Sequence, residues 1–123
     1  MTNFELVKEF MRSFGQDVLT EASLSDERTR KLRANLILEE SAEVQGAIDE
    51  KDIHNIAKEL TDLLVVTYGA GAAFGIDLDK CFEEVHRSNM SKLGVDGKPV
   101  YREDGKILKG ENYTPADLRE ILK

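Results

Sequence analysis

Two short acidic clusters constrain the fold of this chain more than any other feature. The first reads E-E-x-x-E and contains Glu40 and Glu43, and the second reads E-x-x-D and consists of Glu59 and Asp62. A spacing of three places the two carboxylates of each pair on one face of a helix. Residues 49–52 (D-E-K-D) lie between the clusters and have the composition of a tight turn. The segment therefore predicts two antiparallel helices joined near residue 50 or 51.

Such a helical hairpin brings the two acidic pairs to matching heights. Glu43 and Glu59 lie about eight residues from the turn, and Glu40 and Asp62 about eleven, which is roughly 12 and 17 Å at ~1.5 Å per residue. Four carboxylates this close cannot all stay ionised without a cation. An all-oxygen ligand set suits Mg²⁺, and also Mn²⁺. We therefore expect Glu40, Glu43, Glu59 and Asp62 to bind a divalent metal.

A solvated acidic face is the alternative interpretation, because most glutamate-rich helix surfaces are of that kind. The surrounding pattern opposes it. Glu40 and Glu43 interrupt the apolar stripe of their helix, and the following helix is apolar almost all round, which is typical of a buried helix. Unpaired carboxylates in an interior are costly. The apolar positions of the two helices are Leu32, Leu36, Ala47 and Ile48, then Ile56, Ala57, Leu60, Leu63, Leu64, Val65 and Val66.

Helical spacing of apolar residues recurs along the first 92 residues. Four helices are expected, over about residues 4–14, 26–48, 53–75 and 78–90, with Ser25, Asp52 and Asp77 as N-caps. The small residues 69–73 inside the third helix indicate a close helix contact, either across a dimer interface or within the chain. Cys81 lies in a helical pattern and is expected to be a buried thiol.

The residues after Lys92 change in character and carry a concentration of lysine and arginine. Asp96-Gly97 and Asp104-Gly105 are turn signals, and short extended segments are expected on both sides of the second turn. Thr114-Pro115 is expected to open a short final helix. The sequence thus predicts an all-α fold in one domain, residues 1–123. It is an antiparallel bundle of about four helices, over about 1–92, followed by a short irregular C-terminal tail with a final short helix, over about 93–123.

Charge and hydropathy exclude several classes of function. The net charge of −7 argues against general nucleic-acid binding. No apolar run reaches ~18 residues without polar breaks, and the N-terminus lacks a basic region followed by an apolar one. A cytoplasmic protein without a membrane partner is expected. In proteins, Mg²⁺ is usually coordinated by one or two carboxylates together with phosphate oxygens of a substrate. A phosphorylated substrate is therefore the natural partner. Arg33, on the same face as Glu40, and Lys106 and Lys109 of the tail supply positive charge for binding it.

Two segments resemble the E-E-x-x-E … E-x-x-D signature of the all-α nucleoside triphosphate pyrophosphohydrolases. These are the MazG-like enzymes, to which phosphoribosyl-ATP pyrophosphohydrolase and dimeric dUTPase are related. The segments are L-E-E-S-A-E from Leu38 and K-E-L-T-D from Lys58. H-R-S-N-M-S-K-L from His86 and D-G-K-I-L-K-G from Asp104 are similar to small single-domain members. The resemblance covers roughly residues 30–115.

The resemblance implies a homodimer or a tetramer built from dimers. It also implies Mg²⁺-dependent cleavage of an NTP or dNTP between the α- and β-phosphates, giving a nucleoside monophosphate and pyrophosphate. Glu40, Glu43, Glu59 and Asp62 match the metal ligands of the family. Glu39 matches the acid that orients or deprotonates the attacking water, and Asn89 and Lys92 match a nucleotide-contacting N-x-x-K element. Phe10, Phe14 and Tyr68 are candidates for base stacking, although core packing is the favoured role of each.

Three further alternatives remain open at this point. Phosphoribosyl-ATP is a second candidate substrate. A non-catalytic helical regulatory module is a third interpretation, opposed by the presence of all five acids. A di-iron carboxylate bundle needs two Glu-x-x-His elements, and only residues 83–86 supply one.

Overall fold

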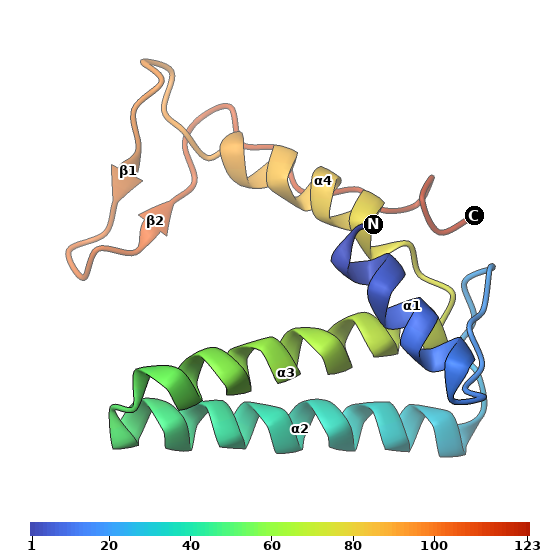
Figure 1. Cartoon of the computed structure of the whole chain (residues 1–123). Helices are drawn as coiled ribbons and strands as arrows, with labels where there is room; N and C mark the ends of the chain where they lie inside the picture. The colour runs from blue at the N-terminus through green and yellow to red at the C-terminus, as the bar shows by residue number, and fades with distance from the viewer. The chain divides into compact units, whose positions relative to one another are not determined.

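The computed structural model describes residues 1–123 and confirms the all-α class with a short C-terminal tail (Figure 1). Almost all regular structure is helical. The elements are α1 (Asn3–Ser13), α2 (Glu27–Glu50), α3 (Ile53–Ala73), α4 (Leu78–Met90), β1 (Val100–Tyr101) and β2 (Ile107–Leu108).

Short polar side chains set where the helices begin. The Asp52 carboxylate accepts hydrogen bonds from the backbone N–H groups of His54 and Asn55, so its predicted role as the N-cap of α3 is confirmed. The prediction for Ser25 is wrong, because Asp26 caps α2 by accepting from the Thr29 N–H. Ser25 instead has a left-handed backbone (φ 56°), and its hydroxyl donates to the carbonyl of Ala73.

The predicted helical hairpin is present. Helices α2 and α3 run antiparallel and side by side (Figure 1), and the chain reverses at Lys51. Lys51 has φ 61°, and its N–H donates to the carbonyl of Ile48, which closes α2 before Asp52 opens α3. A break this short holds the two helices in contact and fixes their register, so residues at equal distances from the turn lie opposite each other.

Helix α1 covers the C-terminal half of α3 and forms the core with it. Phe4, Val7 and Met11 of α1 pack against Ala72 and Ala73, which explains why α3 carries small residues there. Tyr68 stacks on Phe4, with ring centroids 5.6 Å apart, so its core role is confirmed. Gly69 and Gly71 also face neighbours within the chain: a Cβ atom would lie 2.8 Å from Arg33 Nη1 at the first and 2.5 Å from Leu78 Cδ1 at the second.

The expectation that α3 is buried all round is wrong within this single chain. Four of its apolar side chains are 39–70% exposed: Ile53, Leu60, Leu64 and Val65. Phe10 and Phe14 of α1 are also exposed, at 50% and 71%, rather than packed in the core. No single helix of the structure is both long enough and apolar enough to span a membrane.

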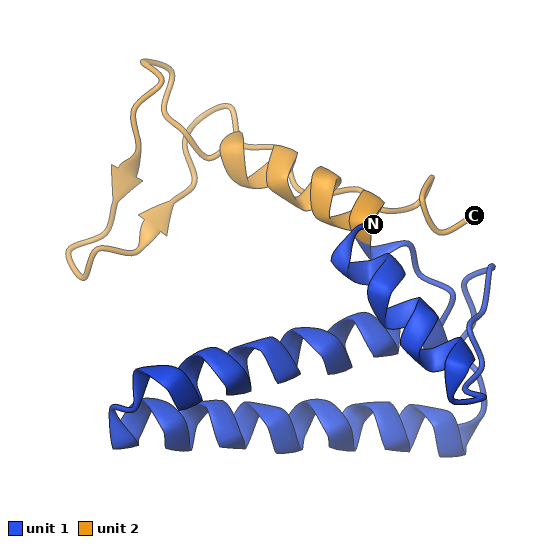
Figure 2. Ribbon diagram, in the orientation of Figure 1, with its two compact units in different colours: residues 1–78 blue, residues 79–123 orange.

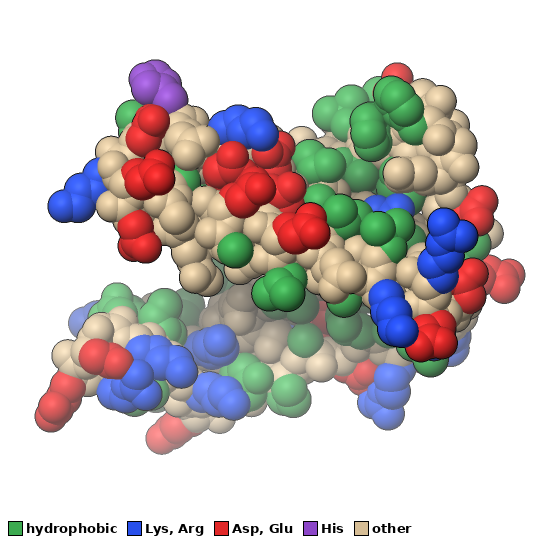
Figure 3. Space-filling view, turned by 90° about the horizontal axis from the view of Figure 1, so that it is seen from below, with side chains coloured by type: hydrophobic (Ala, Val, Ile, Leu, Met, Phe, Trp, Pro, Cys, Tyr) green, Lys and Arg blue, Asp and Glu red, His purple; other side chains and the backbone are tan.

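The chain forms two compact units, residues 1–78 and 79–123 (Figure 2). The first holds α1, α2 and α3, and the second holds nearly all of α4 and the tail. Within the second unit, β1 and β2 pair antiparallel around the predicted Asp104-Gly105 turn. Basic side chains gather on this hairpin (Figure 3).

The predicted final helix is absent, since residues 114–118 have no regular structure and residues 119–122 form turns. The start of this segment is engaged in contacts with α4 instead. The Arg87 guanidinium donates to the Thr114 hydroxyl, the Ser88 hydroxyl donates to the Thr114 carbonyl, and the Asp117 N–H donates to Glu84. These bonds tie Thr114 to another element, so it does not cap a helix of its own.

Candidate metal centre

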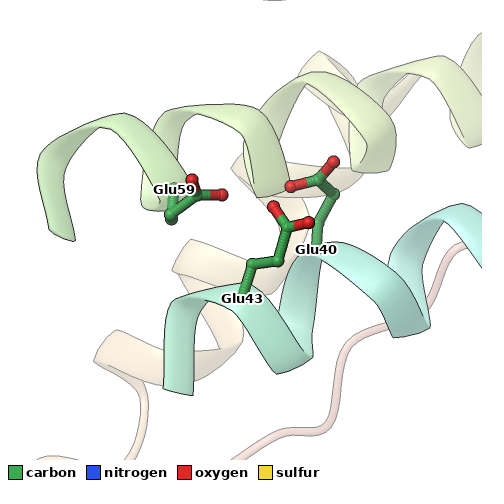
Figure 4. A group of neighbouring side chains, drawn as sticks. All are labelled: Glu40, Glu43 and Glu59. Atoms are coloured by element: carbon green, nitrogen blue, oxygen red, sulfur yellow. The ribbon is translucent and has the colours of Figure 1, made fainter. Parts of the chain in front are cut away.

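Three of the four predicted ligands converge between α2 and α3. Glu40 and Glu43 extend from α2, and Glu59 extends from α3 toward them (Figure 4). One carboxylate oxygen from each residue lies within 4.8 Å of the other two. The hairpin register places Glu43 opposite Glu59, and the spacing of three brings Glu40 to the same helix face. This is the arrangement that the sequence predicted for these three residues.

Charge repulsion and burial make this cluster unfavourable without a cation. The pKa of Glu59 is raised, first by a hydrogen bond shared with the Glu43 carboxyl, then by burial and by the charge of Glu43. The pKa of Glu40 is raised by burial and by the charges of Glu43 and Asp62. Glu59 is 9% exposed, and one oxygen each of Glu40 and Glu59 is buried without any hydrogen-bond partner. Buried carboxylate oxygens that lack partners, in a cluster of this kind, are what an oxygen-coordinated cation satisfies.

Asp62 lies beside the three glutamates but is held by a lysine. It is half-buried, and its charge acts on both Glu40 and Glu59. Lys58, four residues earlier on α3, forms an ion pair with Asp62, and its Nζ lies 3.9 Å from Glu59 Oε1. The ammonium of Lys58 therefore partly neutralises the cluster. Sequence reasoning missed this role, although the spacing of four between Lys58 and Asp62 was visible.

Glu39 is exposed and immediately precedes the ligand candidate Glu40. Adjacent helix positions point about 100° apart, so Glu39 does not join the three-carboxylate group, which consists of Glu40, Glu43 and Glu59. Its predicted role toward the attacking water stays a prediction.

Arg33 lies apart from the carboxylates. Seven residues separate it from Glu40, which is ~10 Å along α2. The side chain is only 7% exposed, and Nη2 makes a long contact of 3.4 Å with Gln16 Oε1. Burial lowers the pKa of the guanidinium, and no carboxylate offsets this. Arg33 is therefore a buried cation on the helix that carries the acids, but at a separate place.

The remaining predicted contacts lie in the second unit. Asn89 is in the last turn of α4, and its carbonyl accepts from the Lys92 N–H, so this pair shares one backbone turn. On the hairpin, the Lys106 N–H donates to Asp104, and Lys109 Nζ lies 4.7 Å from the centre of the Tyr113 ring. The part that these four residues play in substrate binding stays a prediction.

Comparison with known proteins agrees with this architecture. The family model described as phosphoribosyl-ATP pyrophosphohydrolase matches residues 7–89, which include α2, α3 and the acidic residues that they carry. An uncharacterised protein of Acanthamoeba polyphaga mimivirus is 34% identical over 128 residues, covering 98% of this chain and 48% of that protein. The chain thus spans about half the length of this relative. The extent of the family match shows that the chain belongs to the phosphoribosyl-ATP pyrophosphohydrolase family.

Proposed function

We propose that this protein is a Mg²⁺-dependent nucleoside triphosphate pyrophosphohydrolase. It cleaves an NTP or dNTP between the α- and β-phosphates and releases a nucleoside monophosphate and pyrophosphate. Membership in the family supports pyrophosphohydrolase activity on nucleotides. The observation that carries the metal dependence is the group of Glu40, Glu43 and Glu59, with two buried oxygens that lack partners.

Each acidic residue has a distinct role in this proposal. Glu40, Glu43, Glu59 and Asp62 hold Mg²⁺, or Mn²⁺ in its place. When bound, the ion neutralises phosphate oxygens and lowers the pKa of a water. Glu39 would orient the attacking water and take its proton as the water oxygen bonds to phosphorus and the bridging P–O bond breaks. Asn89, Lys92, Lys106 and Lys109 contact the nucleotide and offset the charge that builds on the leaving pyrophosphate.

Lys58 lies beside the proposed metal ligands and has a place in the same proposal. Its ammonium pairs with Asp62, and Nζ lies 3.9 Å from Glu59 Oε1. With these carboxylates holding Mg²⁺, Lys58 would lose this pairing, and its long, 67% exposed side chain would reach a phosphate oxygen of the substrate. The same lysine thus serves as a counter-ion in one state and as a substrate contact in the other.

Pyrophosphate release from each dNTP with Mg²⁺ tests the proposal. Glu59→Gln removes one ligand charge and should abolish activity. Glu27→Gln is the matched control, because Glu27 lies on α2 in an exposed pair with Lys31, far along the helix from the cluster. Equal activity of Glu59→Gln and the wild type would contradict the assigned metal centre.

Phosphoribosyl-ATP is the second candidate substrate, and the description of the matching family favours it. It is hydrolysed at the same bond, so product analysis alone does not separate the two substrates. Comparison of kcat/KM across a panel of NTPs, dNTPs and phosphoribosyl-ATP separates them. A non-catalytic module is the remaining alternative, and absence of hydrolysis across the whole panel with Mg²⁺ and with Mn²⁺ would favour it.

We also propose that the chain assembles as a homodimer or as a tetramer built from dimers. The support is the apolar surface that α2 and α3 leave uncovered: Leu38, Ile48, Ile53, Leu60, Leu64 and Val65 are all 39–70% exposed. Light scattering tests this directly. A species of 13.8 kDa at micromolar concentration would rule out the assembly.

A further inference from the structure

A pocket of about 670 Å³ lies at the end of the helical hairpin opposite its turn. Its walls come from the connection after α1, the first turns of α2 and the last residue of α3, near the end of α2 that begins at Glu27 (Figure 1). The lining residues that matter here are Gln16, Ser23, Ser25, Arg28, Thr29 and Arg33. All of them belong to the first compact unit, so the pocket is complete within that unit.

Arg33 lines this pocket and is its one buried charged residue. More than nine-tenths of the residue is buried, and Nε has no hydrogen-bond partner. Nη1 occupies the space beside Gly69, where a Cβ atom would lie 2.8 Å away, and the only side-chain contact of Nη2 is the long one to Gln16. A buried cation without a counter-ion is unfavourable. The guanidinium therefore offers donors in a fork that suits a bidentate anion.

The rest of the pocket fits the same class of ligand. The N-terminus of α2 contributes a partial positive charge, and this helix has 24 residues. Arg28 adds a second guanidinium, and Ser23 and Thr29 add hydroxyl groups. Two acids also line the pocket: Asp26 is engaged in capping α2 through the Thr29 N–H, and Asp17 is exposed at the rim. Arg28 and Arg33 offset the charges of these two acids, and the one charged side chain of the lining that is buried is that of Arg33.

We propose that this pocket binds a phosphate-type oxyanion through Arg33, Arg28 and Gln16, at a site separate from the carboxylate cluster. Arg33 and Glu40 are ~10 Å apart along α2, so one phosphate group does not reach both. The oxyanion is either free phosphate or a phosphate group of a bound nucleotide that lies away from the reacting bond. The proposal concerns binding without metal and stands whether or not the proposed hydrolysis is found.

Titration with inorganic phosphate in the presence of EDTA tests the site. Calorimetry should show saturable binding to the wild type at constant ionic strength, although the chain has a net charge of −7. Arg33→Gln should weaken it by at least about tenfold, because charge-assisted hydrogen bonds are lost. Glu59→Gln should leave it unchanged. Lys31→Gln is the matched control, since Lys31 has the same charge near the same helix end, pairs with Glu27 and does not line the pocket.

Arg33 is buried, so circular dichroism must show that Arg33→Gln folds. If it does not fold, the Arg28→Gln variant decides alone, because Arg28 is exposed. Its affinity for phosphate should be several-fold weaker than that of the wild type. Absence of saturable binding to the wild type, or unchanged affinity in the folded variant, overturns the proposal. Competition between phosphate and a nucleoside monophosphate, again with EDTA, identifies the source. If phosphate and the nucleotide exclude each other, the pocket is part of a nucleotide site. If both bind at once, the pocket is a site for the free ion.

Discussion

Removal of the metal is the perturbation whose effect follows most directly from the carboxylate cluster. In the metal-free protein, Glu40, Glu43 and Glu59 repel one another, and two of their oxygens have no partner. A ligand that binds only the folded state at 100 times its Kd adds ~2.7 kcal/mol to the free energy of unfolding. The Tm of a domain of this size changes by roughly 3–6 °C for each kcal/mol of stability, so the expected rise in Tm is about 8–16 °C.

Thermal melts with EDTA, with Mg²⁺ and with Mn²⁺ measure this effect, and NaCl at matched ionic strength is the control.

The Glu59→Gln variant makes the test more specific. Because the folded-state pKa of Glu59 is raised, the folded protein holds this proton more tightly than the unfolded chain, and the metal-free protein loses stability as pH rises through that pKa. The neutral glutamine side chain of the variant avoids this loss. The variant should melt higher than the metal-free wild type at pH 7 and show no metal-dependent rise. A Tm of the wild type that does not change at millimolar metal would refute a preformed metal centre.

Three further predictions concern single residues. Glu39→Gln should bind Mg²⁺ normally by calorimetry but turn over ~10²–10⁴-fold more slowly, as expected for loss of a general base; a loss of metal affinity would make Glu39 a ligand instead. Lys58→Met should bind Mg²⁺ several-fold more tightly, because a competing cation is removed, whereas Lys31→Met should not; weaker binding in Lys58→Met would refute this. The pKa of Glu84 is lowered to about 2, first by the hydrogen bond from Arg87 and then by that from the Asp117 N–H. A lowered pKa means that the stabilisation is present above the ordinary value and is lost as pH falls toward 2, so hydrogen exchange at Asp117 should accelerate in that range; a rate that follows only the ordinary pH dependence of exchange would contradict it.

The helical hairpin and its three glutamates were predictable because they depend on local rules. Helix periodicity set the face of each carboxylate, and Asp52 marked the start of α3, so counting from the turn placed Glu43 opposite Glu59. No long-range information was needed. The short strands around Asp104-Gly105 were predictable for the same reason, since the turn residues themselves define the register.

The features that sequence reasoning missed depend on contacts between distant residues. Ser25 does not cap α2 because its hydroxyl bonds to Ala73, 48 residues away. Thr114 opens no helix because Arg87 and Ser88 hold it. The burial of the Arg33 side chain depends on the space beside Gly69. None of these partners is visible from periodicity, which reports the face of a helix but not what covers it.

The bond that is cleaved tests the central claim most directly. A ³¹P NMR time course of a dNTP with the wild-type protein and excess Mg²⁺ follows every product at once. Our account predicts equal amounts of nucleoside monophosphate and pyrophosphate, with no reaction in EDTA or in Glu59→Gln. Accumulation of orthophosphate and a nucleoside diphosphate, or equal rates with and without metal, would contradict it.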